Sequence, residues 1–354
     1  MIPVEVVFNP NWWHLNYDIC FDEHFYLDRQ TRTDSDVIMR NALYNRFGFG
    51  ESHPQPRPIL GSMMVAGGFV LPALFGVPIR FSDNEAPCPA GQSMSDAEIM
   101  ALRLPELEHT WPLDVLLRDG AVLQDAYGSV IGDFDLDGLF NTALHLRGQQ
   151  LFMDLMDAPE LVHHLFSVLA ETYVALVSMM RRLTGSCAIA TNRSIINVNP
   201  AIFLHSNCSV CMISPALYEK TLLPYELYLA ERLQPYGIHH CGNNLHRFAP
   251  AYGKVPAIFF DVGWGSDVTR CREAFPGAFL NLRLDPVDML RKIPEEVQEI
   301  TTQLLAEGYS PSKTGVCCIN MDYGTPDENV MAMVEAAEDY CRALRFEVKE
   351  TYRP

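Results

Sequence analysis

The stretch YGIHHCGNN, Tyr236 to Asn244, places two histidines and a cysteine at the end of an apolar segment. Side chains alternate between the two faces of a β-strand, so His239 and Cys241 are expected to share one face while His240 points to the other. Imidazole nitrogen and thiolate sulfur are ligands that zinc prefers. Two ligands do not complete a site, and a His-x-Cys pair by itself also fits an ordinary packed strand end.

The late segment TGVCCIN adds two thiols, Cys317 and Cys318, on another expected strand. If the two strand ends meet at one edge, one of these thiolates can join His239 and Cys241. Three protein ligands with a fourth position open are typical of catalytic zinc. Asp261 follows the apolar run AIFFDVG, and at the same edge it would act as a catalytic acid, base or substrate acceptor, with a turn role as the alternative.

The elements that must position these residues alternate along the second half of the chain. Strands are expected at GIHHC, AIFFDVG, AFLNLRL and TGVCCIN, and a helix follows each of them. This order predicts parallel βαβ units, in either an open sheet or a closed barrel. No glycine-rich dinucleotide loop follows a strand, which favours an α/β fold of the (β/α)8 TIM-barrel type, with its working face at the carboxyl ends of the strands.

A proline-rich segment, GESHPQPRPILGS, occupies residues 50–62. It predicts a passage between an N-terminal helical and extended extension, residues 1–57, and a barrel formed by residues 58–354. Within the extension, a helix is expected from Thr33 or Asp34 up to Gly48.

Composition limits the classes of partner. The formal net charge of −18 argues against nucleic acid and anionic membranes, since both require a basic face. The N-terminus shows no export signal, and no run of about 18 apolar residues appears. The ten cysteines are therefore expected to be reduced thiols or metal ligands in a cytoplasmic protein, with the oligomeric state left open.

Four segments carry a resemblance to a known family. They are HHCGN (residues 239–243), ISPALYEKTLLPYE (213–226), LRGQQLFMDLMDAPELVHHLF (146–166) and CCINMDYGTPDENV (317–330). Together they resemble the uroporphyrinogen decarboxylase-like superfamily, and within it the zinc-dependent methyltransferases that work with corrinoid proteins. The resemblance implies a (β/α)8 barrel with Zn²⁺ at its mouth, held by His239, Cys241 and one of Cys317 and Cys318.

The resemblance also implies an activity: methyl transfer between a small substrate and the cobalt of a corrinoid (cobalamin) carried by a partner protein. O-demethylation of a methoxylated aromatic is the first expectation, and a methylcobamide:thiol or methylcobamide:tetrahydrofolate methyltransferase is the alternative. A metal-free decarboxylase-like barrel and a closed structural zinc site are further alternatives. The decarboxylase branch has an arginine-rich N-terminal segment, whereas this chain has no arginine before Arg29.

Several residues are candidates for the substrate pocket. An aromatic lid could be formed near the N-terminus by Trp12, Trp13, His14 and Tyr17, with simple packing of the extension as the alternative. His205 and Asn207 are predicted to line the pocket. Their neighbours Cys208 and Cys211 form a Cys-x-x-Cys without a second pair at zinc-ribbon spacing, so core packing is expected for both.

Overall fold

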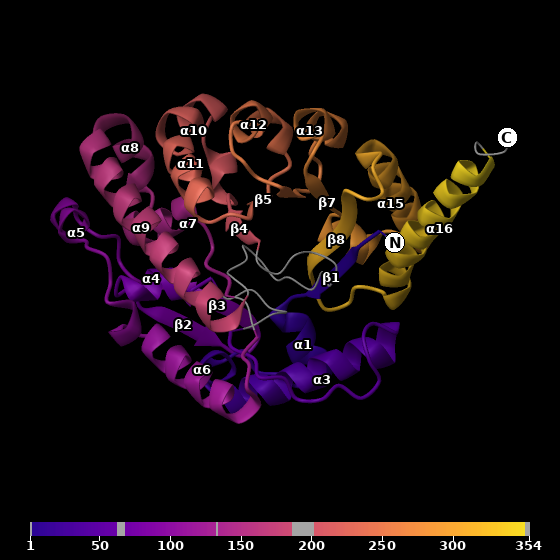
Figure 1. Cartoon of the computed structure of the whole chain (residues 1–354), viewed down its shortest axis with the longest axis horizontal. Helices are drawn as coiled ribbons and strands as arrows, with labels where there is room; N and C mark the ends of the chain where they lie inside the picture. The colour runs from indigo at the N-terminus through magenta and orange to yellow at the C-terminus, as the bar shows by residue number, and fades with distance from the viewer. Residues whose placement is uncertain (1, 62–67, 132–133, 186–201, 351–354) are drawn as a thin grey trace.

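The computed structural model describes residues 2–61, 68–131, 134–185 and 202–350. Its main element is a curled six-stranded sheet in the order β1-β8-β7-β6-β5-β4, in which all neighbours run parallel (Figure 1). The strands are β1 (Val4–Phe8), β4 (Phe203–Ser206), β5 (Tyr236–His240), β6 (Phe259–Val262), β7 (Phe279–Arg283) and β8 (Thr314–Met321). Because the strands are parallel, their carboxyl ends lie along one edge of the sheet.

Helices cover the outer side of this sheet (Figure 1). Those that connect or follow its strands from β4 onward are α10 (Pro215–Thr221), α11 (Leu223–Arg232), α12 (Leu245–Tyr252), α13 (Val268–Ala274), α14 (Pro286–Arg291), α15 (Pro294–Gly308) and α16 (Asp327–Glu350). The predicted alternation of strand and helix is confirmed. A break just before Pro224 separates α10 from α11, and the Ser214 side chain accepts the Leu217 N–H to start α10.

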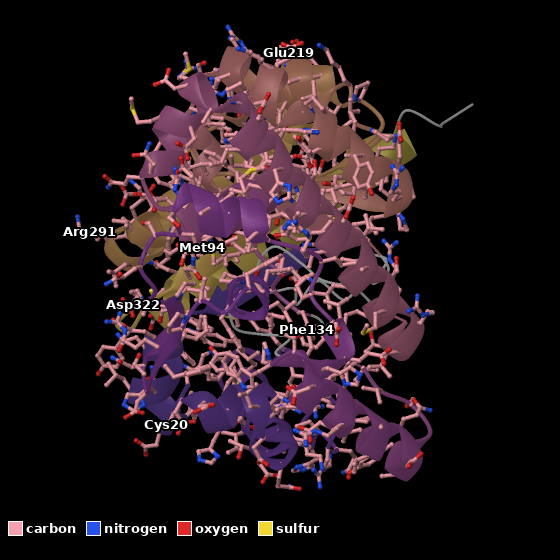
Figure 2. The ribbon with its side chains drawn as sticks, turned by 90° about the vertical axis from the view of Figure 1, so that its left-hand side faces the viewer. Cys20, Met94, Phe134, Glu219, Arg291 and Asp322 are labelled. Atoms are coloured by element: carbon pink, nitrogen blue, oxygen red, sulfur yellow. The ribbon has the colours of Figure 1, made fainter. Side chains whose placement is uncertain are left out.

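The first half of the chain is mainly helical. Its helices are α1 (Pro10–Tyr17), α2 (Glu23–Leu27), α3 (Arg29–Phe47), α4 (Val70–Leu74), α5 (Asp96–Ala101), α6 (Leu113–Tyr127), α7 (Leu139–Arg147), α8 (Gln150–Asp157) and α9 (Pro159–Thr184), and its hairpin is β2 (Ile79–Ser82) with β3 (Glu85–Pro89). Figure 2 shows Cys20, between α1 and α2, at the opposite end of the molecule from Glu219 on α10.

The N-terminal strand is part of the main sheet, although it falls inside the expected extension of residues 1–57. β1 pairs with β8 from Val4 opposite Val316 to Phe8 opposite Met321. The last four residues of β1 are buried. The helix expected from Thr33 or Asp34 begins earlier: α3 starts at Arg29, because the Asp28 side chain accepts the Thr31 N–H and caps it.

Short extended segments near Ile59 and Ile131 lie parallel to each other outside the six-stranded sheet. Ile59 and Ile131 form an isolated parallel bridge, and the Ser206 N–H at the end of β4 points to the Asp137 carbonyl at 3.4 Å. The described residues thus form a curled parallel α/β sheet of half-barrel shape. Closure into the complete (β/α)8 barrel stays a prediction.

Helix α9 is long and apolar enough to cross a membrane by length and composition alone. However, 61% of its most apolar window is buried inside the protein, where it packs against α7, α8 and α11. A core helix passes the same test, so the pattern is weak evidence for a membrane span.

Candidate metal centre

The ends of β4 and β5 bring together three residues that can ligate a metal. Ser206 on β4 lies opposite His239 on β5, so continuing this register by two residues places Cys208 beside Cys241. The ligand atoms of Cys208, His239 and Cys241 all lie within 4.8 Å of one another. We refer to these three residues as the thiolate–imidazole group.

The predicted alternation along β5 is confirmed. His239 Nε2 lies 2.6 Å from Cys241 Sγ, on the inner face of the sheet. His240 points the other way, where its Nδ1 lies 2.9 Å from the Tyr252 hydroxyl on α12. Burial lowers the pKa of His240 to about 4, so this histidine is a neutral packing residue.

A carboxylate fixes the orientation of His239. Asp261 on β6 lies opposite His239, and its Oδ2 is 2.8 Å from His239 Nδ1. Asn281 on β7 lies opposite Asp261 and donates from Nδ2 to Oδ1 at 2.8 Å. Asp261 therefore holds the imidazole with Nε2 directed at the sulfur atoms, the arrangement by which carboxylates orient histidine ligands. Asp261 is 2% exposed, and it contacts Nδ1, the ring atom of His239 that does not face the sulfur atoms.

The two cysteine side chains contact each other, with Cys208 Sγ 2.7 Å from Cys241 Sγ. That contact, with His239 and Arg283 nearby, holds the pKa of Cys241 well below its usual range although burial opposes the shift. The same contact and burial raise the pKa of Cys208 well above its usual value.

His239 is charged by the same neighbours. Burial by itself would lower the pKa of His239, but the Cys241 thiolate and the Asp261 carboxylate raise it to about 9. In the absence of metal, His239 and Cys241 are therefore an imidazolium–thiolate pair at neutral pH. When a metal binds, His239 has to lose the proton on Nε2 and Cys208 has to lose its thiol proton, as ligand donors do.

The donor set fits zinc. Two thiolates and one imidazole nitrogen are soft and borderline ligands, which suit Zn²⁺ and do not suit Mg²⁺ or Ca²⁺. The carboxylate behind His239 supplies the outer partner that zinc-binding histidines usually have. Cys208 and Cys241 are partly exposed, whereas His239 is buried.

Neither late cysteine belongs to the thiolate–imidazole group. Cys317 is fully buried against Val7 and Ile319, and burial together with Asp261 and Glu5 raises its pKa well above the usual value. Cys318 packs into the main core, and burial raises its pKa to about 12. Cys317 does face Arg283 across the β7–β8 pairing, on the same inner surface as His239.

Cys208 is the residue that the sequence interpretation missed, because it was assigned to core packing. Its signal was the Cys-x-x-Cys spacing at the end of a strand. Its partner Cys211 is exposed in the following 3₁₀ turn (Ser209–Met212), and its thiol donates to the Cys208 carbonyl at 3.2 Å. Cys211 thus lies beside the group without being one of its three members.

His205 and Asn207 have partners other than a substrate. Both are 2% exposed and both donate to Glu226 on α11, His205 from Nδ1 at 2.9 Å and Asn207 from Nδ2 at 2.8 Å. The hydroxyls of Tyr218 and Tyr236 complete this buried set, which we call the Glu226 cluster. Four donors hold the carboxylate charged, and the pKa of Glu226 is about 2 despite its burial.

The aromatic residues of α1 pack into the core. Trp12 and Trp13 are each 1% exposed, and the Trp12 ring stacks on Phe8 at 3.9 Å. Tyr17 contacts both tryptophan rings, while His14 Nδ1 lies 3.2 Å from the Ile19 carbonyl. These contacts fasten α1 onto β1, and they correspond to the packing alternative.

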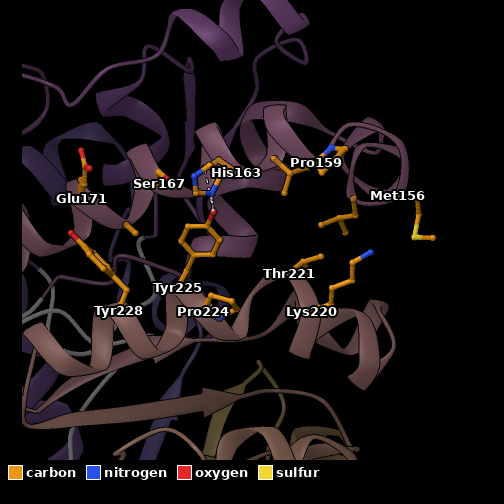
Figure 3. Close-up of a pocket in the computed structure, with 13 residues that line it drawn as sticks. Met156, Pro159, His163, Ser167, Glu171, Lys220, Thr221, Pro224, Tyr225 and Tyr228 are labelled. Carbon is orange, nitrogen blue, oxygen red and sulfur yellow. Dashed lines mark hydrogen bonds between the residues drawn. The ribbon is translucent and has the colours of Figure 1, made fainter.

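A separate cavity of about 510 Å³ lies between α9 and the pair α10 and α11 (Figure 3). His163 and Tyr225 face each other across it, with Nδ1 2.5 Å from the hydroxyl. Met156 and Lys220 lie at one end and Tyr228 at the other (Figure 3). None of the described residues that line this cavity is a cysteine, so the cavity is separate from the thiolate–imidazole group.

Comparison with known proteins places the chain in a family. No curated protein matches it. Among solved structures, a methyltransferase from Methanosarcina mazei superposes with a TM-score of 0.70 at 16% identity, covering 96% of this chain and 94% of the other, which shows a shared fold. A family model described as Uroporphyrinogen decarboxylase (URO-D) matches residues 62–340, well over half of the sequence. The resemblance to that superfamily is confirmed, and the chain belongs to the uroporphyrinogen decarboxylase (URO-D) family.

Proposed function

We propose that this protein is a zinc-dependent methyltransferase that moves a methyl group between a small substrate and the cobalt of a corrinoid. The observation that carries the proposal is the thiolate–imidazole group at the strand ends, with two sulfur donors and an imidazole that Asp261 orients. Membership of the URO-D family and the fold shared with a Methanosarcina methyltransferase support it.

Each residue has a role in this proposal. Cys208, Cys241 and His239 Nε2 would hold the zinc, and a fourth position would remain for a substrate oxygen or sulfur. A zinc ion so held supplies Lewis acidity, which stabilises a departing alkoxide or phenolate or lowers the pKa of a thiol. Asp261 keeps the proton of His239 on Nδ1, so that Nε2 is available as a ligand.

The proposal assigns the corrinoid to a partner protein, since the sequence has no evident cobalamin-ligating histidine motif. The methyl source that we propose is a methoxylated aromatic, which makes the reaction an O-demethylation. The same three ligands serve the opposite direction, so a methylcobamide:thiol or methylcobamide:tetrahydrofolate transferase is the alternative. The family's name does not by itself assign a reaction to this chain.

The contacts of the first arginines argue against porphyrinogen decarboxylation. A tetrapyrrole with many carboxylates requires several free arginines in the N-terminal region. Arg29 and Arg32 both contact Asp119, at 3.3 and 2.8 Å. Arg32 is also buried, so its guanidinium is committed to the protein interior.

A closed structural zinc site is the second candidate, and the position of Cys211 favours it. This thiol lies in the turn directly after Cys208, at the spacing that zinc ribbons use. If Cys211 closed the coordination sphere, the site would have three sulfurs and no position for substrate. X-ray absorption of the zinc protein separates the candidates, because Cys211→Ser would lower the sulfur count only for the closed site.

Methyl transfer itself tests the proposed function. Zinc-loaded protein is mixed with 2-methoxybenzoate and cob(I)alamin, and methylcobalamin formation is followed by absorbance. We expect formation by the wild type, none by His239→Ala or Cys241→Ala, and an unchanged rate in Cys20→Ala, which alters an exposed thiol outside the site. A rate that survives in both site variants would contradict the assigned ligands.

A further inference from the structure

Arg283 ends β7 with its side chain directed into the centre of the curled sheet. The residue is 5% exposed, and its Nη1 donates to Cys241 Sγ at 3.4 Å. A guanidinium has five N–H donors and is always charged at neutral pH. Arg283 therefore places a permanent cation directly beside the thiolate–imidazole group.

Most of the hydrogen-bonding capacity of this guanidinium is unused. Among the described residues, Arg283 donates only through Nη1, and its Nε is buried without a partner. Asn281, two residues earlier on the same strand, has a buried Oδ1 that is also without a partner there. Native proteins pair the large majority of buried side-chain polar atoms, so unpaired donors beside a candidate site point to a group that binds there.

The nearby carboxylate of Asp261 does not accept a hydrogen bond from the unpaired donors of Arg283. Asp261 lies near Arg283, but its Oδ2 faces His239 and its Oδ1 faces Asn281. Buried Arg272 provides a contrast, because four backbone carbonyls and a hydroxyl surround its guanidinium. Arg283 is thus a buried arginine whose Nε and Nη2 edge lacks an acceptor in the described part of the chain.

We propose that Arg283 binds a carboxylate group of the substrate whose methyl group is transferred. This inference rests on the proposed function and narrows its substrate class to carboxylate-bearing methyl compounds, such as methoxybenzoates. The Nε and Nη2 donors form a planar fork that matches the two oxygens of a carboxylate. Nη1 contacts Cys241 at the same time, so the fork fixes the distance between the carboxylate and the metal ligands.

Binding of acetate and acetamide tests the proposal without turnover. Acetate is the smallest organic probe of a carboxylate subsite, and acetamide has the same shape without the charge. Cobalt(II) replaces zinc, and the paramagnetic relaxation of the probe's methyl protons is measured by NMR. In the wild type we expect acetate to bind about tenfold more tightly than acetamide, because hydrogen bonds to a charged group are strong.

Three variants test whether Arg283 causes the preference for acetate over acetamide. Arg283→Met should remove the preference for acetate, and Arg283→Lys should retain only part of it, because lysine keeps the charge but lacks the fork. Arg270→Met, which alters an exposed arginine on α13, should leave the preference unchanged. Cobalt content is measured for each protein.

The outcomes separate this inference from the proposed function. Equal binding of acetate and acetamide to the cobalt-loaded wild type, no binding of either, or a preference that persists in Arg283→Met would overturn the carboxylate subsite alone. A wild type that takes up no metal would contradict the zinc proposal first. If Arg283→Met fails to fold, Arg283→Lys keeps the test, because acetate that binds through cobalt alone would show the same preference in Arg283→Lys as in the wild type.

Discussion

Two histidines on adjacent strands of this protein each contact a carboxylate, and the two pairs have different roles. His205 on β4 donates from Nδ1 to Glu226, and His239 on β5 contacts Asp261 through the same ring atom at nearly the same distance. The difference lies at Nε2. His205 Nε2 accepts the Leu139 backbone N–H, whereas His239 Nε2 faces a thiolate.

The comparison teaches that a buried histidine–carboxylate pair is not by itself a functional signal. In the Glu226 cluster each carboxylate oxygen accepts two hydrogen bonds, and the imidazole is used at both nitrogens. This satisfied set ties β4, β5, α10 and α11 together. The other pair directs Nε2 at Cys241, where a metal can take the place of the proton between nitrogen and sulfur.

The largest effect is expected from Glu226→Ala. The substitution leaves His205, Asn207 and two tyrosine hydroxyls buried without their acceptor, so the free energy of unfolding should fall by about 3–5 kcal/mol. Urea unfolding measures it. Glu231→Ala on the same helix is the control, because Glu231 is exposed and its removal should change stability by less than about 0.5 kcal/mol. A similarly small change in Glu226→Ala would show that the cluster is not structural.

Acid titration tests whether the charged form of Glu226 stabilises the fold. The pKa of Glu226 is lowered from 4.5 to about 2, so its contribution is complete above pH 4.5 and is lost as the pH falls through about 2. The shift corresponds to about 3 kcal/mol. Between pH 5 and 2 the free energy of unfolding of the wild type should therefore fall by about that much more than that of Glu226→Gln. Parallel curves would refute the charged carboxylate.

A smaller effect is expected at the other pair. Asp261→Asn keeps the shape of the side chain but weakens the hold on His239 Nδ1, so zinc affinity should fall about 10–100-fold. Competition with a chromophoric chelator measures the affinity. Asp267→Asn is the matched control, because this exposed aspartate caps α13 and does not contact His239. Equal affinities in wild type and Asp261→Asn would place Asp261 outside the metal centre.

The parts of the site that depend on local geometry could be predicted from the sequence. The shared face of His239 and Cys241 follows from strand alternation, and Asp261 follows from the carboxyl end of the next strand. The position of Cys208 could not be predicted in this way. It depends on the register between β4 and β5, which residues far apart in the sequence decide.

The same limit explains the aromatic residues and the N-terminal boundary. Trp12 and Trp13 have the composition of a pocket, but only the pairing of β1 with β8 shows that their helix folds back onto buried Phe8. The proline-rich segment after residue 50 gave a clear linker signal. It could not reveal that the strand before it belongs to the main sheet, because sheet pairing is a long-range property.

Zinc content of purified Cys208→Ala and Cys317→Ala, beside the wild type, tests the central claim most directly. The structure places Cys208 with His239 and Cys241 and leaves Cys317 buried apart from them. We expect about one zinc per chain in the wild type and in Cys317→Ala, and none in Cys208→Ala. Loss of zinc from Cys317→Ala with retention in Cys208→Ala would contradict the account and restore the ligand set that the family resemblance implies.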